Sequence, residues 1–294
     1  AIVRDLQDHP HDRRLKLLPP RQPPDAAALL NNLRLTMLQL HGFDLVDPVS
    51  APRVPDDLRT FQQLLRGNPV RRWELGAVRY FLSLSGAEDY LNHLDGGSDR
   101  FRPVADAALE PVPGGIGVTD DAPEREKVLS LVRFDGALPK HRFVPEAVAI
   151  DPGTVPVDVA GRRLAEPDFD PQSTALVHAD IAVPSPVAED ATLRLNVMED
   201  SSVETVLEPD TSREALLVLA VTFDPDWKVF IDGERARLLR TNVLFQGVVV
   251  PAGRHEVVFS YRPSIIPLAV AGVARVLLLA GVVVCVGRRR DETP

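Results

Sequence analysis

Apolar and polar residues alternate along the second half of the chain, from about residue 171 onward. The run from His255 to Tyr261 places an aromatic or apolar residue at nearly every second position, and Trp227 to Ile231 repeats this period. Successive side chains of a β-strand point to opposite faces, so each run offers one apolar face to a core. Turn signals at Asp232-Gly233 and at Pro251 separate the runs. The pattern predicts an antiparallel β-sandwich over residues 171–263.

The first 150 residues show a different, mixed pattern. Apolar residues at near-helical spacing after Asp25 predict a helix over residues 26–40, and a second helix is expected over 56–65, ended by Gly67-Asn68-Pro69. The compact apolar run 75–82 predicts a buried strand. Loop or weak strand is expected over 95–123, and further strands are expected over 127–134 and 142–150. Residues 1–150 therefore form a mixed α/β subdomain, and the fold class is α+β.

A 22-residue apolar stretch, 265–286, follows the last predicted strand and contains a single charge, Arg275. A helix of this length spans about 33 Å, close to the hydrocarbon core of a bilayer. A central arginine costs about 2.5–3.5 kcal/mol, which the many Leu, Ile and Val residues outweigh. We therefore expect one C-terminal transmembrane helix over 264–287, with Arg275 facing other membrane helices that this sequence lacks. A buried helix of a soluble domain is the alternative.

The charges beside this stretch predict its orientation. Arg288, Arg289 and Arg290 follow it directly, as is typical of a cytoplasmic end. We expect residues 288–294 to form a cytoplasmic tail, with the bulk of the chain outside the cytoplasm at the cell membrane. The sequence begins at Ala1 without a signal-peptide pattern, so we expect it to be part of a longer protein.

Composition excludes several classes of function. The 294 residues carry a formal net charge of −9, which disfavours nucleic acid as a partner, because that affinity depends on neutralising phosphates. Cys285 is the single cysteine, so neither an intramolecular disulfide nor a cysteine-based metal site can form. We expect no cofactor and no metal.

The segment from Phe223 to Pro263 resembles the C-terminal region of YfhO-like bacterial membrane proteins. In that family a "GW-x-V-x-V-DG" strand, an "R-x-N-x-x-F-x-G-V-x-V-P-A-G-x-H-x-V" stretch and a "Y-x-P" precede a membrane helix. The sequence departs from the family pattern at Asp226, where glycine is usual, and at Arg275, where the helix is normally uncharged. The likeness is looser over 137–144 and 75–82. The matching positions are Trp227, Asp232, Gly233, Arg240, Asn242, Phe245, Gly247, Pro251, Gly253, His255, Val257, Tyr261 and Pro263.

The resemblance implies a multi-pass glycosyltransferase of the C-type class, which uses lipid-phosphate-linked sugars outside the cytoplasm. In that class the catalytic carboxylate typically lies in the first extracytoplasmic loop, and no part of this chain corresponds to that loop. We therefore expect no catalytic residue here and leave open whether the chain itself is an enzyme. The implied partners are the lipid bilayer, the missing N-terminal membrane helices, a polyprenyl-phosphate sugar and an envelope glycan.

Three residues are candidate substrate contacts. Trp227 could stack on a sugar, although its place on the apolar face of its strand also suits the core. Arg240 and Asn242 could bind a sugar or phosphate, but each could equally fix a turn through hydrogen bonds to the backbone.

Two acidic groups resemble weak metal sites. Asp8-His-Pro-His-Asp12 offers ligands for a divalent ion, and Asp224, Asp226 and Asp232 offer oxygen ligands for a hard cation. Both are better explained as solvated turns. The glycines at 114–117 lack the lysine and helix of a phosphate-binding loop.

Two functions remain open at this point. In the first, the chain is the extracytoplasmic C-terminal portion of a membrane-embedded glycosyltransferase that modifies cell-envelope glycans. In the second, it is a membrane-tethered sandwich that binds envelope glycans or proteins and catalyses nothing.

Overall fold

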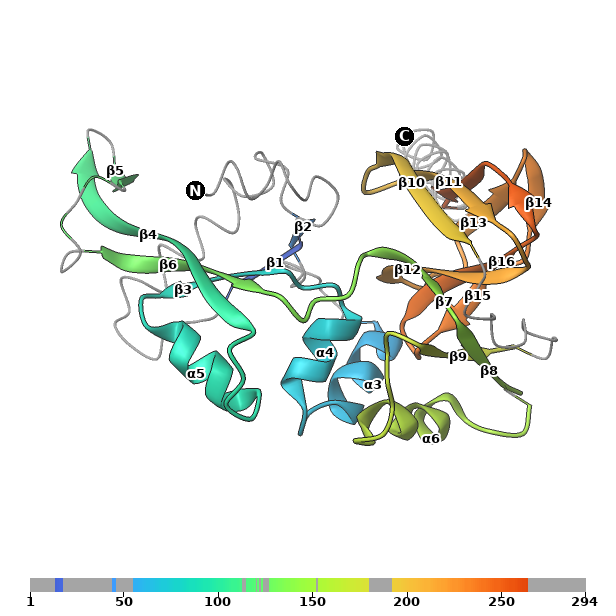
Figure 1. Cartoon of the computed structure of the whole chain (residues 1–294), viewed down its shortest axis with the longest axis horizontal. Coiled ribbons are helices and arrows are strands. Elements are labelled where there is room, and N and C mark those ends of the chain that lie inside the picture. The colour runs from blue at the N-terminus through green and yellow to red at the C-terminus, as the bar shows by residue number, and fades with distance from the viewer. Residues whose placement is uncertain are drawn as a thin grey trace, which may run out of the picture.

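The computed structural model describes residues 14–17, 44–45, 55–112, 115–119, 121, 123, 127–151, 153–179 and 192–263. Strands dominate this part of the chain and form three sheets, with short helices between them (Figure 1). The expected α+β class, rich in β-structure, is confirmed. The predicted helix 26–40, the segment 264–287 with Arg275, the tail 288–294 and the cluster from Asp8 to Asp12 all lie outside the described residues.

The front of the molecule is built on a sheet with strand order β2-β1-β3-β6-β4-β5. Strand β1 is parallel to both β2 and β3, whereas the remaining pairs are antiparallel. Part of the stretch 95–123, expected to be loop or weak strand, forms the long strand β4. The strand bounds are β1 Arg14–Leu17, β2 Asp44–Leu45, β3 Tyr80–Leu84, β4 Phe101–Val112, β5 Gly115–Thr119 and β6 Lys127–Phe134.

Aromatic rings form the core of this front part. Phe101 stacks on Phe134 with 4.3 Å between ring centroids, and Trp73 meets Phe81 edge-on at 4.8 Å. Helix α5, Ala87–Leu94, adds the fully buried Leu91 to the same cluster. Large rings bury much apolar area in a small sheet, which stabilises it beyond what its aliphatic side chains supply.

Short helices connect the front sheet to the rest of the chain. Helix α3 covers Asp56–Leu64, as the sequence predicts, and α4 covers Pro69–Leu75. Helix α6, Val157–Gly161, runs into a 3-10 turn over Arg162–Ala165. These elements share one hydrophobic cluster with the sandwich, in which the Phe61 and Phe245 rings meet at 5.3 Å. A Cβ on Gly161 would lie within about 2.6 Å of Leu64 and Val243, so the close packing requires glycine there.

The back of the molecule is a pair of facing sheets. The first has the order β7-β12-β16-β15-β9-β8, and the second β10-β11-β18-β13-β14 with β17 also paired to β11. Every pair in the second sheet is antiparallel, while β8 and β9 of the first are parallel. The first sheet contains β7 His141–Val144, β8 Glu146–Ile150, β9 Thr174–His178, β12 Ala215–Thr222, β15 Leu239–Thr241 and β16 Phe245–Val250. The second contains β10 Leu193–Asp200, β11 Glu204–Thr211, β13 Trp227–Ile231, β14 Glu234–Ala236, β17 Gly253–Arg254 and β18 Val257–Tyr261.

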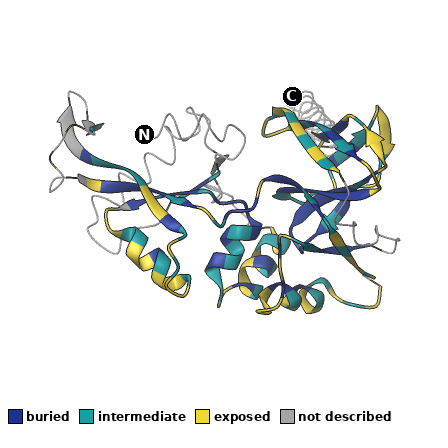
Figure 2. Cartoon of the chain, viewed as in Figure 1, coloured by how far each residue is buried: buried dark blue, intermediate teal, exposed yellow. Residues whose placement is uncertain are grey.

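The core between these sheets follows the alternation seen in the sequence. Trp227, Val229 and Phe259 of the second sheet are buried with Leu217 and Val248 of the first. Figure 2 shows this interior in dark blue, with exposed residues along the outer strands. The two-residue period therefore correctly predicts which residues face each other.

The boundary of the sandwich lies earlier in the chain than residue 171. Strands β7 and β8, within the predicted 1–150 subdomain, pair with β12 and β9 of the sandwich. The subdomain built on the front sheet is therefore shorter than the predicted 150 residues, because residues 141–150 are strands of the sandwich. No helix in the described part of the chain is long and apolar enough to cross a membrane.

Candidate functional site

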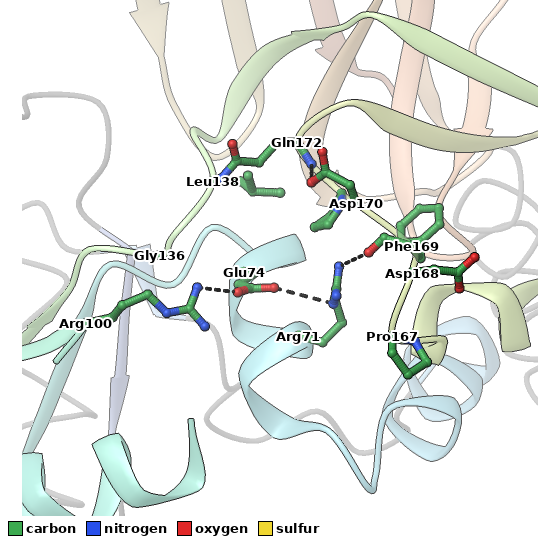
Figure 3. Close-up of a pocket in the computed structure, with 11 residues that line it drawn as sticks. Arg71, Glu74, Arg100, Gly136, Leu138, Pro167, Asp168, Phe169, Asp170 and Gln172 are labelled. Carbon is green, nitrogen blue, oxygen red and sulfur yellow. Dashed lines mark hydrogen bonds and ion pairs between the residues drawn. The ribbon is translucent and has the colours of Figure 1, made fainter. Parts of the chain in front are cut away.

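Two adjoining hollows lie where the front sheet meets the helices, with volumes of about 300 and 540 Å³. Both are lined by Arg71, Glu74 and Arg100, and Figure 3 shows these three with the other residues of the smaller hollow. We call the two hollows together the charged cleft. Residues 167–172, which precede β9, form one wall of the smaller hollow, and residues 67–70 form part of the larger one.

Helix α4 supplies two of the three shared residues. Its N-terminus is capped by Asn68, whose side-chain oxygen accepts a hydrogen bond of 2.9 Å from the Arg71 N–H, and Pro69 occupies the first turn. Arg71 and Glu74 are one turn apart on this helix, with Nε and Oε2 separated by 3.5 Å. The helix therefore presents a cation and an anion side by side to the cleft.

Arg100, immediately before β4, links this pair to α5. Its Nη1 lies 2.7 Å from Glu74 Oε1, and its Nε donates to Asp95 Oδ2 at 2.7 Å. The hydrogen bonds that Arg100 donates to Asp95, and to a lesser extent to Glu74, hold the pKa of Arg100 above its ordinary value despite partial burial. The guanidinium also lies 5.3 Å from the centre of the Phe134 ring. Arg100 is thus held rigidly in place by its own partners.

Phe169 fixes the opposite wall. Its carbonyl accepts a hydrogen bond of 2.6 Å from Arg71 Nη1, and its ring lies between the guanidiniums of Arg71 and Arg163, at 6.0 and 5.6 Å. Arg163 in turn pairs with Asp168 at 2.7 Å. Because the Phe169 ring is almost fully buried, it is closed to a stacking ligand.

Several polar groups of the cleft are left for a ligand. Neither Arg71 Nη2 nor the Gln172 amide has a partner among the described residues, and Gln172 is exposed. Asp170 uses one carboxylate oxygen to accept from the Gln172 N–H at 3.0 Å. Burial pushes the pKa of Asp170 upward, but hydrogen bonds from Ser173 and Gln172 outweigh it and leave the pKa below its usual value.

The charge balance of the cleft selects against anions. Carboxylates outnumber guanidiniums in its lining, so a phosphate or carboxylate ligand would meet a net negative surface. A neutral polyhydroxyl ligand fits better, because each hydroxyl both donates and accepts. Neither hollow has a serine, cysteine or histidine among its described lining residues, so its polar chemistry comes from carboxylates, guanidiniums and amides. The lining carboxylates are Glu74, Asp95, Asp168 and Asp170, and the guanidiniums are Arg71 and Arg100.

None of the substrate contacts proposed from the sequence lines this cleft. Trp227 is buried in the sandwich core, with its ring 5.6 Å from that of Tyr261. Asn242 is fully buried at a backbone φ of 47°, and its side-chain oxygen accepts a hydrogen bond of 2.9 Å from the Leu176 N–H. Of the two roles left open for Asn242, fixing the backbone is the one with a visible contact. A ligand role for these residues stays a prediction.

Arg240 lies beside a buried histidine. It pairs with Asp57 of α3 at 2.5 Å and covers the Phe223 ring at 4.5 Å. His178 is the cross-strand partner of Arg240, and neither of its ring nitrogens has a hydrogen bond within the described residues. Burial first, and the nearby Arg240 second, lower the pKa of His178 to about 4. His178 is therefore neutral at physiological pH.

The acidic residues of the 224–232 region are used locally. Asp224 Oδ1 accepts from the Asp226 N–H at 2.8 Å, whereas Asp232 Oδ1 and Oδ2 bind the Glu256 N–H and His255 Nδ1. The described residues contain no group of three or more acidic, histidine or cysteine side chains suited to a metal ion.

The sequence contained one unused signal for the charged cleft. Asn68 followed by Pro69 is typical of a helix start, with a cap residue followed by proline in the first turn. The prediction made from the sequence places the end of the preceding helix at this pair. It therefore does not include α4, the helix that places Arg71 beside Glu74. Arg100 and Asp95 carry no local signal, because they reach Glu74 only through the tertiary fold.

Comparison with known proteins adds no relative. No protein-family model matches the chain, and no curated protein or solved structure is significantly similar to it.

Proposed function

We propose that the chain is the extracytoplasmic C-terminal portion of a membrane-embedded, YfhO-like glycosyltransferase, and that its charged cleft binds the glycan that accepts the sugar. Catalysis belongs to a part of the parent enzyme outside this chain. The charged cleft is the observation that carries the binding role, because its paired charges, surplus of carboxylates and free amide suit a neutral polyhydroxyl ligand.

Residues of the YfhO-like motif have structural roles that support this proposal. Asp232 and Gly233 form the β13–β14 turn at positive φ, and His255 binds Asp232 at 2.6 Å. Gly247 lies where a Cβ would come within 2.7 Å of Thr241. Because these motif residues stabilise the sandwich, the same motif is expected in every family member that has this sandwich, whichever sugar that protein transfers.

The membrane setting is supported by the sequence next to β18. The strand ends at Tyr261, and only three residues separate it from the 22-residue apolar stretch 265–286. Such a stretch is long enough for a transmembrane helix. The sandwich would then be held close to the bilayer, where a lipid-linked sugar donor is presented.

Glycan binding can be tested by titrating the full chain in detergent with neutral gluco-, galacto- and manno-oligosaccharides and monitoring heat or NMR shifts. Gln172→Ala and Asp170→Asn should each weaken binding several-fold, since each removes a group left for a ligand, while Asn at 170 retains the backbone hydrogen bond. Gln62→Ala, an exposed change on α3, is the matched control and should bind as wild type. A phosphorylated sugar that binds more tightly than its neutral parent would contradict the charge argument.

The catalytic part of the proposal has its own test. The purified chain should not transfer sugar from a polyprenyl-phosphate donor, because the implied catalytic loop is absent from it. Turnover that disappears when one of its own carboxylates is mutated would overturn this. The alternative is a membrane-tethered binding module that does not belong to any enzyme. It predicts in addition that the gene product containing this chain transfers no sugar in native membranes.

A further inference from the structure

The hairpin between β10 and β11 carries the two most exposed large apolar side chains among the described residues. Met198 is 59 % exposed and Val203 is 54 % exposed. Single exposed apolar residues are ordinary on protein surfaces, but two on one hairpin form a protruding apolar tip. We call residues 198–204 the hairpin tip.

The backbone of the hairpin tip is well satisfied by internal hydrogen bonds. The Ser201 N–H donates to the Glu204 carbonyl at 2.8 Å, and Ser201 Oγ accepts from the Glu204 N–H at 3.0 Å. The Val203 carbonyl accepts a hydrogen bond of 2.7 Å from the Tyr261 N–H. Backbone groups that are already paired can approach an apolar phase without the penalty of losing water.

The base of the tip is fixed to the facing sheet. Asp200, the last residue of β10, is held by Lys140 and His141 at the start of β7 and by Thr205 of β11. This buried contact ties the end of β10 to the facing sheet, so the exposed side chains of the tip project from a fixed base. The exposure of the tip is therefore built into the sandwich.

The tip lies at the end of the sandwich from which the apolar stretch departs. The Tyr261–Val203 hydrogen bond places it beside the last residue of β18, and residues 265–286 follow soon after. The same end carries Tyr261, which is partly exposed, and the exposed Arg262, whose guanidinium lies 4.7 Å from the Phe230 ring. Tyrosine is enriched at the boundary between lipid and water, and a long arginine side chain can reach it.

We propose that the hairpin tip rests in the bilayer surface, with Met198 and Val203 at the boundary between the lipid headgroups and the acyl chains. This rests on the membrane setting proposed above, and it adds a second contact that fixes the tilt of the sandwich. The apolar stretch alone would leave the sandwich free to pivot on a few residues. A second contact beside the end of β18 restricts this pivoting and holds the sandwich, with the charged cleft, in one orientation.

The proposal is tested with an environment-sensitive fluorophore on single cysteines in the full chain. The background is Cys285→Ser, and the probe positions are Met198→Cys and Val203→Cys. The controls are Val159→Cys on α6, which lies at the other end of the sandwich in Figure 1, and Arg235→Cys on β14. The protein is reconstituted in vesicles of phosphatidylcholine and phosphatidylglycerol, with or without lipid carrying a nitroxide on its acyl chain.

Probes at 198 and 203 should shift to shorter emission wavelength on reconstitution and lose fluorescence with the nitroxide lipid, whereas the controls should do neither. Flotation of the vesicles separates the two proposals. If the chain floats with the vesicles but the tip probes behave like the controls, the hairpin contact is wrong and the membrane setting stands. If the chain does not float, both are overturned.

Discussion

Lys140 Nζ lies 2.9 Å from both carboxylate oxygens of Asp200, across the interface between the two sheets of the sandwich. Both side chains are about nine-tenths buried. The second neighbour, His141 Nε2, is 3.4 Å from Asp200 Oδ1. Burial alone would raise the pKa of Asp200, but the neighbouring His141 and Lys140 side chains lower it to about 2.

Replacing Asp200 by asparagine should strongly destabilise the fold. The change leaves the Lys140 ammonium buried without its counter-charge, which costs about 3–5 kcal/mol in free energy of unfolding. Urea denaturation at neutral pH measures this cost. Glu199→Gln, an exposed change one residue away, should stay within about 0.5 kcal/mol of wild type. Equal stability of the two variants would show that the pair contributes little.

Asp200 should also shape the acid limb of stability. Its carboxyl has a pKa of about 2 in the folded protein against 3.8 as the ordinary value. The depressed pKa means that its contribution, about 2 kcal/mol, is complete above pH about 4 and is lost as the pH falls through about 2. Asp200→Asn should therefore flatten the fall in unfolding free energy over this window. A variant that keeps the wild-type slope would assign the acid limb to other carboxylates.

His255 should titrate above its ordinary value. Its hydrogen bond to Asp232 is the largest cause of the raised pKa. The stabilising contribution is fully present below the unfolded pKa and is lost as the pH rises through the folded pKa. NMR titration of the imidazole measures this directly. Asp232→Asn should lower the His255 pKa, whereas the control Asp210→Asn should leave it where it is.

Asn242 should prove structural. Asn242→Ala removes the acceptor of the buried Leu176 N–H and places alanine at a φ of 47°. The two effects together should cost about 2–4 kcal/mol. Asn242→Gly relieves the backbone strain and should fall between alanine and wild type. If alanine were tolerated but glycan binding disappeared, Asn242 would be a ligand contact instead.

Arg142 should be replaceable with a gain in stability. Within the described residues its Nε and Nη2 have no hydrogen-bond partner, and its only bond is from Nη1 to the Pro139 carbonyl at 3.3 Å. Burial lowers the pKa of Arg142 to about 10. Arg142→Met retains the stem and removes the desolvated charge, so we expect a gain of about 1 kcal/mol or more in thermal unfolding experiments. A loss of stability would reveal a partner for the guanidinium.

The sequence predicted best where one local period decides the structure. The alternation through Trp227, Val229 and Phe259 placed these residues in a common core because each strand has one face to bury. The same reasoning could not find the limits of the sandwich. β7 and β8 are short runs whose partners lie far along the chain, and nothing local shows which sheet they join.

The charged cleft was beyond sequence reasoning for a related cause. Arg71 and Glu74 are close in sequence, but their meaning depends on Arg100 and Phe169, which the tertiary fold brings to them. Asn242 shows the opposite case. Both of its interpretations could be written from the sequence, and a hydrogen bond to Leu176 was needed to identify the contact it makes.

The early position of β7 and β8 has a consequence for how the protein is made. During synthesis both strands leave the ribosome before β12 and β9, with which they pair. Until those partners appear, their backbone donors and acceptors are unpaired, and such edges readily join the wrong chain. The front sheet can close much earlier, because its strands are complete by residue 134. Nascent chains halted after β8 has been made and before β12 has been made should therefore be the species most prone to aggregate.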